Sequence, residues 1–475
     1  MLTGQTGAAE RPEPELFGHP HGLTFLFTTE MWERFSYYGM RAILVLYLTN
    51  YLLLEPTATN VVGYQTIKGF CEWLVGHSLA PQPFSSMIYG LYTGLVYLTP
   101  FFGGIIADRY LGQRITVIIG AIVMAIAEFT LVLPNMFFVG LLLLIVGNGF
   151  FKPNISTQVG NLYKPGDSRI DRAFSVFYVG INVGAFLGST ICGSVLGENY
   201  GYHWGFFAAG VGMILGLIIY LVALRTLPND RVTRMKVTHE EKKPLTSQDW
   251  KAVIALVLLC IPTTFFWATY EQQGNTISLW AQNFTDRRLI PGIIDWQIPV
   301  TFFQSFNPAM IVAFTPLIVW LWARQAKKGT EPSTVTKMAL GLFLLAISYV
   351  VMALAAYFAP HGGASWLWLF VFFAIITAGE LYLSPIGLAL VARVAPAKIL
   401  SMMMGLWFIT SFTGNFLQGY IGTYFDVLDK VTFFLMCAGI GFAAGVVTWL
   451  FNFPLKPILE GNSEPRAVPD PLASQ

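Results

Sequence analysis

Long apolar stretches recur along the whole chain, and no other feature limits so strongly what it can fold into. One helical crossing of a lipid bilayer needs about 20 consecutive apolar residues, and the 475 residues contain twelve such stretches between short polar connections. In addition, 55% of the residues are hydrophobic and only 11% are charged, whereas soluble globular proteins carry about 25% charged residues. These values exclude a soluble protein and predict an all-α integral membrane protein with twelve transmembrane helices.

The twelve stretches fall into two groups of six, separated by a charge-rich segment. Two six-helix bundles joined by a linker are typical of major facilitator transporters, whose halves rock about a central site. The predicted boundaries are a cytoplasmic tail at 1–21, a first bundle at 22–225 with a periplasmic insertion at 55–83, a cytoplasmic linker at 226–249, a second bundle at 250–453 and a cytoplasmic tail at 454–475.

The distribution of lysine and arginine predicts how the chain is oriented in the membrane. With the N-terminus inside, 21 of the 28 Lys and Arg residues fall in inside segments and four in outside segments. Loops rich in Lys and Arg stay on the cytoplasmic side. We therefore expect both termini in the cytoplasm and, from residues up to Phe17 that lack a signal-peptide pattern, insertion directed by the first helix.

Composition excludes several other classes of protein. A formal net charge of +2 provides no basic surface for nucleic acid, and the four cysteines lie far apart without a CxxC pair. We therefore expect neither a disulfide framework nor a metal site. A membrane-embedded hydrolase is disfavoured because neither HExxH nor GxSxG occurs in a suitable context, so an enzyme is not expected.

The first stretch carries ionisable side chains that do not suit a lipid environment. An ionisable residue at the bilayer centre costs about 2.5–3.5 kcal/mol on insertion scales and is usually paired and functional. At about 100° per residue, Arg34, Tyr37 and Arg41 share a helix face with Glu30, and Glu33 lies beside that stripe. This pattern predicts a helix face that presents acids, bases and a phenol to a polar interior.

Isolated charges also occur in later stretches. Lys152 lies in the first half, whereas Glu271 and Glu380 lie in the second. Candidate partners for a buried ammonium at Lys152 are Glu30 and Glu33 in its own half and Glu271 in the other. Since the intramembrane cations all come from the first half and the second contributes only anions, a central cavity would be bipolar. The residues alone thus predict a proton-coupled transporter of a small dipolar solute.

Ordered motifs then indicate a known family. Residues 30–35 (Glu-Met-Trp-Glu-Arg-Phe) and 37–41 (Tyr-Tyr-Gly-Met-Arg) resemble the hallmark of the proton-dependent oligopeptide transporters, a family of the major facilitator superfamily. Residues 103–112 and 177–184 resemble two further signatures of that family. The resemblance extends over all twelve stretches, and ordered runs of this length are far more specific than one short pattern.

The resemblance implies a bacterial-type symporter that imports di- and tripeptides with protons by alternating access, without a cofactor, as a monomer in the inner membrane. Arg41 and Lys152 would attract the peptide carboxylate, Asn182 and Asn307 would hydrogen-bond the termini or the amide, and Glu380 would receive the amino terminus. The residues implied to line side-chain pockets are Tyr37, Tyr38, Tyr97, Trp267, Trp407 and Ser411. The residues implied to carry proton coupling are Glu30, Glu33, Arg34, Lys152 and Glu271, with a salt bridge between Lys152 and Glu271.

Two departures and two alternatives accompany this resemblance. Animal members carry a histidine where this chain has Gly90, so proton coupling should depend on carboxylates, and segment 226–249 is too short for the two extra helices of many bacterial members. The same fold could carry another small dipolar or anionic solute, such as nitrate, a modified amino acid or a drug-like compound. A receptor that senses peptides without transporting them is the second alternative.

Overall fold

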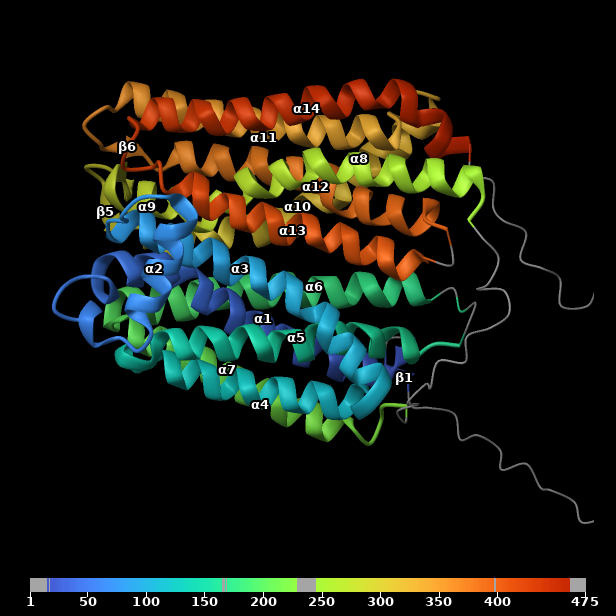
Figure 1. Cartoon of the computed structure of the whole chain (residues 1–475), viewed down its shortest axis with the longest axis horizontal. Helices are drawn as coiled ribbons and strands as arrows, with labels where there is room; N and C mark the ends of the chain where they lie inside the picture. The colour runs from blue at the N-terminus through green and yellow to red at the C-terminus, as the bar shows by residue number, and fades with distance from the viewer. Residues whose placement is uncertain are drawn as a thin grey trace, which may run out of the picture.

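The computed structural model describes residues 15–16, 18–164, 167, 169–228, 245–396 and 399–461. Long helices run side by side along the longest axis of the molecule, and short strands are confined to its ends (Figure 1). We call the end that carries α2 (Tyr64–Val75) the α2 end, and the opposite end, where α7 stops and α8 starts, the linker end. Most of the predicted tails 1–21 and 454–475 and of the linker 226–249 lies outside the described residues.

The first bundle is built around α1. This helix packs against α6 and α7, while α5 packs against α3 and α4. The π-helical segments η1 (Leu48–Leu52) and η5 (Ser189–Glu198) extend α1 and α6 towards the α2 end. The long helices of this bundle are α1 (His21–Tyr47), α3 (Pro81–Ile106), α4 (Gln113–Leu131), α5 (Phe137–Asn161), α6 (Ile170–Gly188) and α7 (Tyr202–Ala223).

The second bundle repeats this arrangement. Helix α11 packs against α12 and α14, α8 packs against α13 and α14, and α10 packs against α12. Helix α8 continues through η7 (Glu271–Gly274) into α9 (Thr276–Asn283), and η8 (Val300–Ser305) precedes α10. The long helices are α8 (Ser247–Tyr270), α10 (Phe306–Lys327), α11 (Thr334–Phe358), α12 (Leu367–Val394), α13 (Leu400–Gly422) and α14 (Lys430–Gly461).

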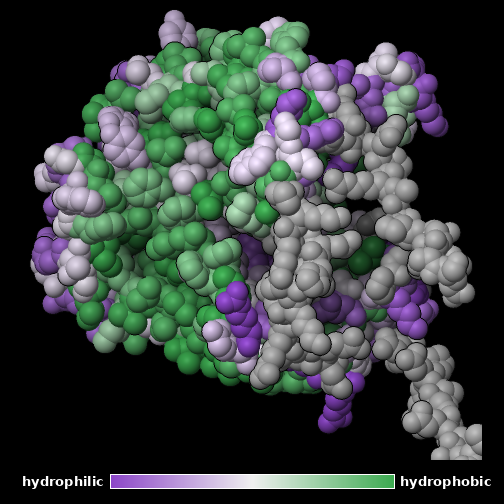
Figure 2. Space-filling view, turned by 45° about the vertical axis from the view of Figure 1, so that its right-hand side comes forward, coloured by the Kyte–Doolittle hydropathy of each residue, from purple (hydrophilic) through white to green (hydrophobic). Residues whose placement is uncertain are grey.

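The helices have the length and composition of membrane-spanning segments. Among the described residues, ten helical segments are long and apolar enough to cross a membrane, and α1 and α13 run alongside them (Figure 1). Figure 2 shows a broad apolar flank with polar residues gathered towards the ends. The helix bounds lie close to the predicted spans; for example, a span predicted at 366–393 corresponds to α12 at Leu367–Val394.

Local sequence signals explain several helix starts. Thr246 and Asp249 form a capping box at α8, in which the Asp249 N–H donates to Thr246 Oγ1 at 3.1 Å and the Thr246 N–H donates to Asp249 Oδ2 at 2.9 Å. The Ser333 hydroxyl accepts the Thr336 N–H at 3.1 Å and thereby caps α11. Pro81 opens α3, where a missing backbone N–H costs nothing.

Three small two-stranded sheets and α2 decorate the ends of the bundles. The predicted insertion 55–83 contains α2, which is amphipathic and partly exposed. The strand pairs are β1 (Glu15–Leu16) with β2 (His19–Pro20), antiparallel; β3 (Thr285–Asp286) with β6 (Ala364–Ser365), parallel; and β4 (Arg288–Ile290) with β5 (Ile294–Gln297), antiparallel.

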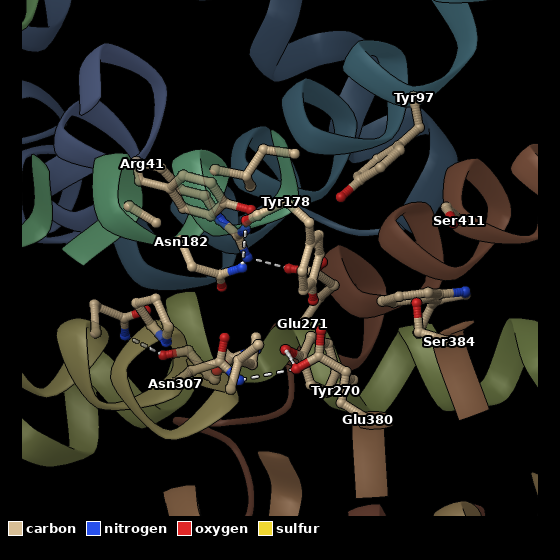
Figure 3. A pocket seen from close by; sticks show the side chains of 18 of the residues that line it. Arg41, Tyr97, Tyr178, Asn182, Tyr270, Glu271, Asn307, Glu380, Ser384 and Ser411 are labelled. Carbon is tan, nitrogen blue, oxygen red and sulfur yellow. Dashed lines mark hydrogen bonds and ion pairs between the residues drawn. The ribbon is translucent and has the colours of Figure 1, made fainter. Parts of the chain in front are cut away.

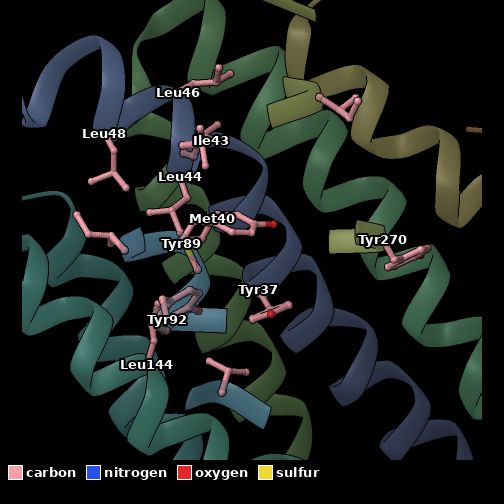
Figure 4. Close-up of a cluster of buried hydrophobic side chains, with 14 of the residues drawn as sticks. Tyr37, Met40, Ile43, Leu44, Leu46, Leu48, Tyr89, Tyr92, Leu144 and Tyr270 are labelled. Carbon is pink, nitrogen blue, oxygen red and sulfur yellow. The ribbon is translucent and has the colours of Figure 1, made fainter. Parts of the chain in front are cut away.

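A dense apolar core fixes the rotation of α1. Met40, Ile43 and Leu44 of α1 are fully buried, and they pack in one cluster with Tyr89 of α3 and Leu144 of α5 (Figure 4). Burying such side chains contributes about 1.5–3 kcal/mol each. Because this face of α1 is held in the core, the side chains on the adjoining face are directed to a fixed place between the bundles.

The two bundles contact each other at the α2 end. Helix α3 lies so close to α13 that a Cβ atom on Gly90 would be 2.6 Å from the backbone oxygen of Asn415. On the opposite side, the Glu198 carboxylate accepts the backbone N–H groups of Val300 and Thr301 at 2.9 and 2.6 Å. We call this contact the Glu198 latch. It joins the end of η5 in the first bundle to the start of η8 in the second.

Candidate functional site

A cavity of about 230 Å³ lies between the two bundles. This volume is below the range of about 300–1,000 Å³ for pockets that hold drug-sized ligands, so the cavity in this conformation suits a small solute. Its lining combines aromatic rings with converging polar groups from both halves (Figure 3). The polar and aromatic lining residues are Tyr38, Arg41, Tyr97, Tyr178, Asn182, Ser189, Trp267, Tyr270, Glu271, Gln273, Gln304, Asn307, Glu380, Ser384, Trp407, Phe408 and Ser411.

One stripe of α6 and its extension η5 provides much of the wall from the first bundle. Tyr178, Ile181, Asn182, Ala185 and Ser189 all line the cavity, and their spacing of three to four residues places them on one helix face. The Asn182 side chain donates to the backbone oxygen of Tyr178 at 2.9 Å. This bond satisfies one donor of the amide and leaves its oxygen for other partners.

Arg41 supplies the positive charge of the cavity and is paired across the bundles. Its guanidinium forms an ion pair with the Glu271 carboxylate and donates from Nε to the Tyr89 hydroxyl at 2.6 Å. The guanidinium carbon also lies 5.9 Å from the centre of the Tyr38 ring, within cation–π range. The side chains of Arg41 and Glu271 are 11% and 3% exposed, so this ion pair is shielded from water and links the two halves.

Glu380 supplies a negative charge on the other side of the cavity. Its Oε2 accepts the Tyr270 hydroxyl at 2.6 Å and the Asn307 amide at 2.9 Å. Asn307 also donates to the Thr377 hydroxyl at 3.0 Å, which fixes the orientation of its amide. In the described part of the chain, Glu380 has neutral hydrogen-bond donors but forms no ion pair. A cationic group of a ligand would therefore find an uncompensated carboxylate here.

A second charged cluster lies within α1. Arg34 forms ion pairs with Glu33 and with Glu30, the latter at 3.0 Å, and all three side chains are nearly inaccessible to solvent. The Asn148 amide of α5 lies 3.4 Å from Glu33 Oε1. Two carboxylates share one guanidinium, so the cluster has an excess negative charge that a proton or a further cation can neutralise.

Lys152 lies beside this cluster rather than in the cavity wall. Its Nζ is 4.6 Å from the centre of the Tyr97 ring, and its charge interacts electrostatically with Glu33, Glu30 and Glu271. The expected salt bridge between Lys152 and Glu271 is wrong: among the described residues Glu271 is paired with Arg41, and Lys152 forms no ion pair within 4 Å. Arg41 lies on the face of α1 next to η7, whereas the Lys152 ammonium rests on Tyr97.

The structure brings together most of the predicted binding residues but excludes two. Tyr37 is buried in the core of the first bundle and, like Lys152, does not line the cavity. The predicted residues that do line it are Arg41, Tyr38, Tyr97, Asn182, Trp267, Asn307, Glu380, Trp407 and Ser411. The predicted proton-coupling residues Glu30, Glu33 and Arg34 lie together in the α1 cluster, and Glu271 lies in the cavity.

Several lining residues were not predicted from the sequence. Tyr178 lies one helical turn before Asn182, and Ser384 one turn after Glu380, so the four-residue helical spacing from a predicted residue would have found both. Tyr270 and Gln273 flank Glu271 in the chain. Gln304 lies in η8, three residues before Asn307 of α10, and no sequence signal indicated that Gln304 lines the cavity. Among the described residues, no group of three His, Cys, Asp or Glu side chains could hold a metal ion.

Comparison with known proteins assigns this architecture to a family. The model of the POT family matches residues 113–238 and 229–440. The chain is 32% identical to the peptide transporter YePEPT of Yersinia enterocolitica, over 93% of this chain and 96% of the relative, and 33% identical to a di-/tripeptide transporter of Lactococcus lactis, over 95% and 98%. The chain belongs to the POT family. POT family members are transporters and not enzymes.

A solved structure supports the same assignment at the level of the fold. The chain matches a POT family transporter crystallised in complex with 5-aminolevulinic acid, with a TM-score of 0.80 and 26% identity, over 94% of this chain and 98% of that chain. The predicted fold class is thereby confirmed: this POT chain is an all-α integral membrane protein with the major facilitator fold of two six-helix bundles.

Proposed function

We propose that this POT protein is a symporter that imports di- and tripeptides together with protons by alternating access. Full-length similarity to proteins named peptide transporter and di-/tripeptide transporter supports the substrate class. The observation that carries the proposal is the cavity itself, where a guanidinium from the first bundle and an otherwise unpaired carboxylate from the second face a space of small-solute size.

A peptide would match these two charges with its termini. Its ammonium group would bind Glu380 without competing with an ion-pair partner among the described residues, and it would add charge-assisted hydrogen bonds. Its carboxylate would compete with Glu271 for Arg41, and the Asn182 and Asn307 amides would bind the termini or the peptide bond. Tyr38, Tyr97, Trp267 and Trp407 would contact side chains through aromatic faces, which accept many shapes. Firm binding of the termini and loose binding of side chains would give broad specificity.

Proton coupling would act through the ion pairs that hold the charges of the first bundle. Protonation of Glu271 would free Arg41 for the peptide carboxylate, because a neutral acid no longer competes for the guanidinium. Protonation of Glu33 or Glu30 would likewise leave Arg34 with a single charged carboxylate partner. It would also remove one negative charge near Lys152. Opening towards a more alkaline cytoplasm would remove these protons and restore the ion pairs, which would expel the peptide.

The proposed setting is a bacterial inner membrane, with both termini and the linker 226–249 in the cytoplasm. The excess of Lys and Arg on that side supports this orientation. We propose that residues 22–225 and 250–453 act as the two moving bundles and that one chain suffices for transport. A potential of 100 mV contributes about 2.3 kcal/mol per charge, or about fortyfold accumulation per net proton.

Uptake of labelled dialanine into proteoliposomes that contain only this protein tests the proposal. We expect accumulation when the interior is alkaline and negative, loss of accumulation with a protonophore, and competition by unlabelled di- and tripeptides but not by free alanine or nitrate. Liposomes without protein are the control. Saturable binding without accumulation would instead indicate a receptor, and competition by nitrate would indicate an anion carrier.

A further inference from the structure

A second cavity, of about 480 Å³, lies at the linker end of the second bundle. We call it the end cavity. It is formed where the first turn of α11, the last turns of α12 and the final part of α14 meet, far along the helices from the α2 end (Figure 1). The residues that line it are Glu331, Pro332, Ser333, Thr334, Lys337, Ile386, Ala389, Leu390, Arg393 and Lys456.

The end cavity carries an excess of positive charge. Of the described residues that line it, Lys337, Arg393 and Lys456 are cations from three different helices, and Glu331 is the anion. Arg393 donates from Nη2 to the Thr334 hydroxyl at 3.1 Å, so its guanidinium is held at the start of α11. A phosphate group could accept hydrogen bonds from these three cations. The hydroxyl groups and backbone N–H groups at the start of α11 are further donors for its oxygens.

Lys337 is held in place by its surroundings. Its side chain is 9% exposed, pairs with Glu331, and places Nζ 4.3 Å from the centre of the Trp322 indole ring. A lysine kept this close to an aromatic face does not spread into solvent as a surface lysine does. The end cavity therefore has a cation held in a fixed position at Lys337, and among the described residues that line it Glu331 is the one carboxylate.

Exposed apolar side chains continue from the end cavity along α14. Trp449, Phe453 and Lys456 are spaced by four and three residues, so they lie on one face of the helix, and Trp449 and Phe453 are 46% and 65% exposed. Leu340, one turn after Lys337 on α11, is also exposed. Cations at the membrane surface followed by exposed apolar side chains along the same helix fit a lipid, whose headgroup is anionic and whose acyl chains are apolar.

We propose that the end cavity binds the phosphodiester headgroup of an anionic phospholipid, with its acyl chains lying along Trp449 and Phe453. Arg393, Lys456 and Lys337 contact the phosphate oxygens, and the Ser333 and Thr334 hydroxyls contact the polar part of the headgroup. The site is separate from the cavity between the bundles and does not depend on which solute this protein carries.

Lipid retention by the full-length protein tests the proposal. Detergent-solubilised protein is incubated with dioleoylphosphatidylglycerol, with dioleoylphosphatidylcholine or with inorganic phosphate, and bound lipid is counted by native mass spectrometry alongside the thermal unfolding midpoint. We expect the phosphatidylglycerol to be retained and to raise the midpoint more than the other two. Because each cation near the membrane surface contributes about 1 kcal/mol, removing two charges with Arg393→Gln and Lys456→Gln should weaken retention about thirtyfold.

Two variants separate this site from general charge effects. Lys327→Gln with Lys328→Gln removes the same charge at the end of α10 without touching the lining, and it should retain lipid as the unaltered protein does. Glu331→Gln removes the anion and frees Lys337, so it should increase retention, a gain that misfolding cannot produce. Equal retention of both lipids, an equal effect of inorganic phosphate, or equal loss in the two double variants would overturn the proposal.

Discussion

Among the carboxylates of the cavity and of the α1 cluster, Glu380 is distinguished by its neutral hydrogen-bond donors. Glu30, Glu33 and Glu271 each contact a guanidinium, whereas Glu380 accepts hydrogen bonds from a phenol and an amide. Removing a charge from water is costly unless it is paired. The cavity therefore retains one carboxylate whose best partner has to come from outside the protein.

Because Glu380 has no cationic partner among the described residues, we expect Glu380→Ala to weaken substrate binding directly. A hydrogen bond to a charged group contributes about 1.5–3 kcal/mol, so the affinity for dialanine should fall about tenfold to a hundredfold. Titration calorimetry of the purified protein measures this affinity. Glu380→Gln keeps the size of the side chain but not its charge, and it should be impaired as well; unaltered affinity in that variant would show that the charge is not used.

The α1 cluster predicts a different phenotype for Glu33→Gln. Glutamine preserves the shape of the side chain beside Arg34 but cannot gain or lose a proton, so gradient-driven accumulation should be abolished while exchange of labelled for unlabelled peptide continues. Parallel uptake and exchange assays in proteoliposomes measure the two activities.

Glu128 offers a matched control for this variant. It is a buried carboxylate of the same bundle that accepts a hydrogen bond from Ser36 at 3.0 Å and lies outside the ion pairs of the cluster. Glu128→Gln should therefore preserve accumulation. Strong uphill uptake by Glu33→Gln would contradict the assignment of proton coupling to this cluster.

The sequence sufficed to predict which charged side chains lie inside the protein but not how they pair. Helical periodicity places Arg41 and Lys152 on faces of their own helices, but only Lys152 was predicted to pair with Glu271, whereas the structure pairs Glu271 with Arg41. The partner is decided by the rotation of α1 and α5 in the folded bundle, which depends on the packing of Met40, Ile43 and their neighbours. Such packing is a property of the assembled core and is not encoded in the spacing of one helix.

Lining residues on long helices were easier to predict than those on short segments. Asn182 was identified from a motif, and the stripe that contains Tyr178 and Ser189 follows from its helical spacing. Gln304 lies in η8, a short 3₁₀ segment, where the spacing of an α-helix gives no guide. Most of the lining residues that were predicted thus lie on long, regular helices, and Glu271, at the start of the 3₁₀ segment η7, is the exception.

The close approach of α3 and α13 gives a prediction for these elements. A Cβ at Gly90 would lie 2.6 Å from atoms of Asn415 and Gly419, so Gly90→Val should disfavour the arrangement in which the α2 end is closed. Overpacking costs about 1–3 kcal/mol, which would shift the equilibrium towards opening about fivefold to a hundredfold.

Distances between spin labels measure this shift. Labels at Val62→Cys and Val427→Cys, both exposed at the α2 end of different bundles, should report a larger population at long distance in Gly90→Val. A background without the four native cysteines is needed. Gly104→Val is the matched control because a Cβ there would meet no atom within 4 Å; the same shift in both variants would contradict the role of the contact.

For the molecule as a whole, the apolar stretches sufficed to predict the fold. Ten of the spans are evident from length and hydropathy in the described residues, and the separation into two halves follows from the charged segment between them. Which end of the two bundles is closed could not be predicted, because hydropathy is the same for every tilt of one bundle against the other. That property depends on contacts such as Gly90 with α13.

The proposed orientation gives a prediction for the intact cell. Cysteines introduced on a cysteine-free background should react with a membrane-impermeant maleimide at Val427, at the α2 end, but at Lys328, at the linker end, only after permeabilisation. This labelling is expected because Val427 lies on the predicted periplasmic side and Lys328 on the predicted cytoplasmic side. Labelling of Lys328→Cys in intact cells would reverse the assigned orientation.

The Glu198 latch also determines what a survey of variants across this protein would reveal. Two of its donors are main-chain N–H groups, which every amino acid except proline provides, and the third is the Thr301 hydroxyl, which donates to Glu198 Oε1 at 2.7 Å. Its acceptor is one side chain, which few replacements can imitate. A mutational scan would record a position at 198 that is sensitive to loss of the carboxylate, and methods that infer contacts from paired changes in sequence would link Glu198 to Thr301, whose side chain donates, rather than to Val300, whose side chain packs in the apolar core.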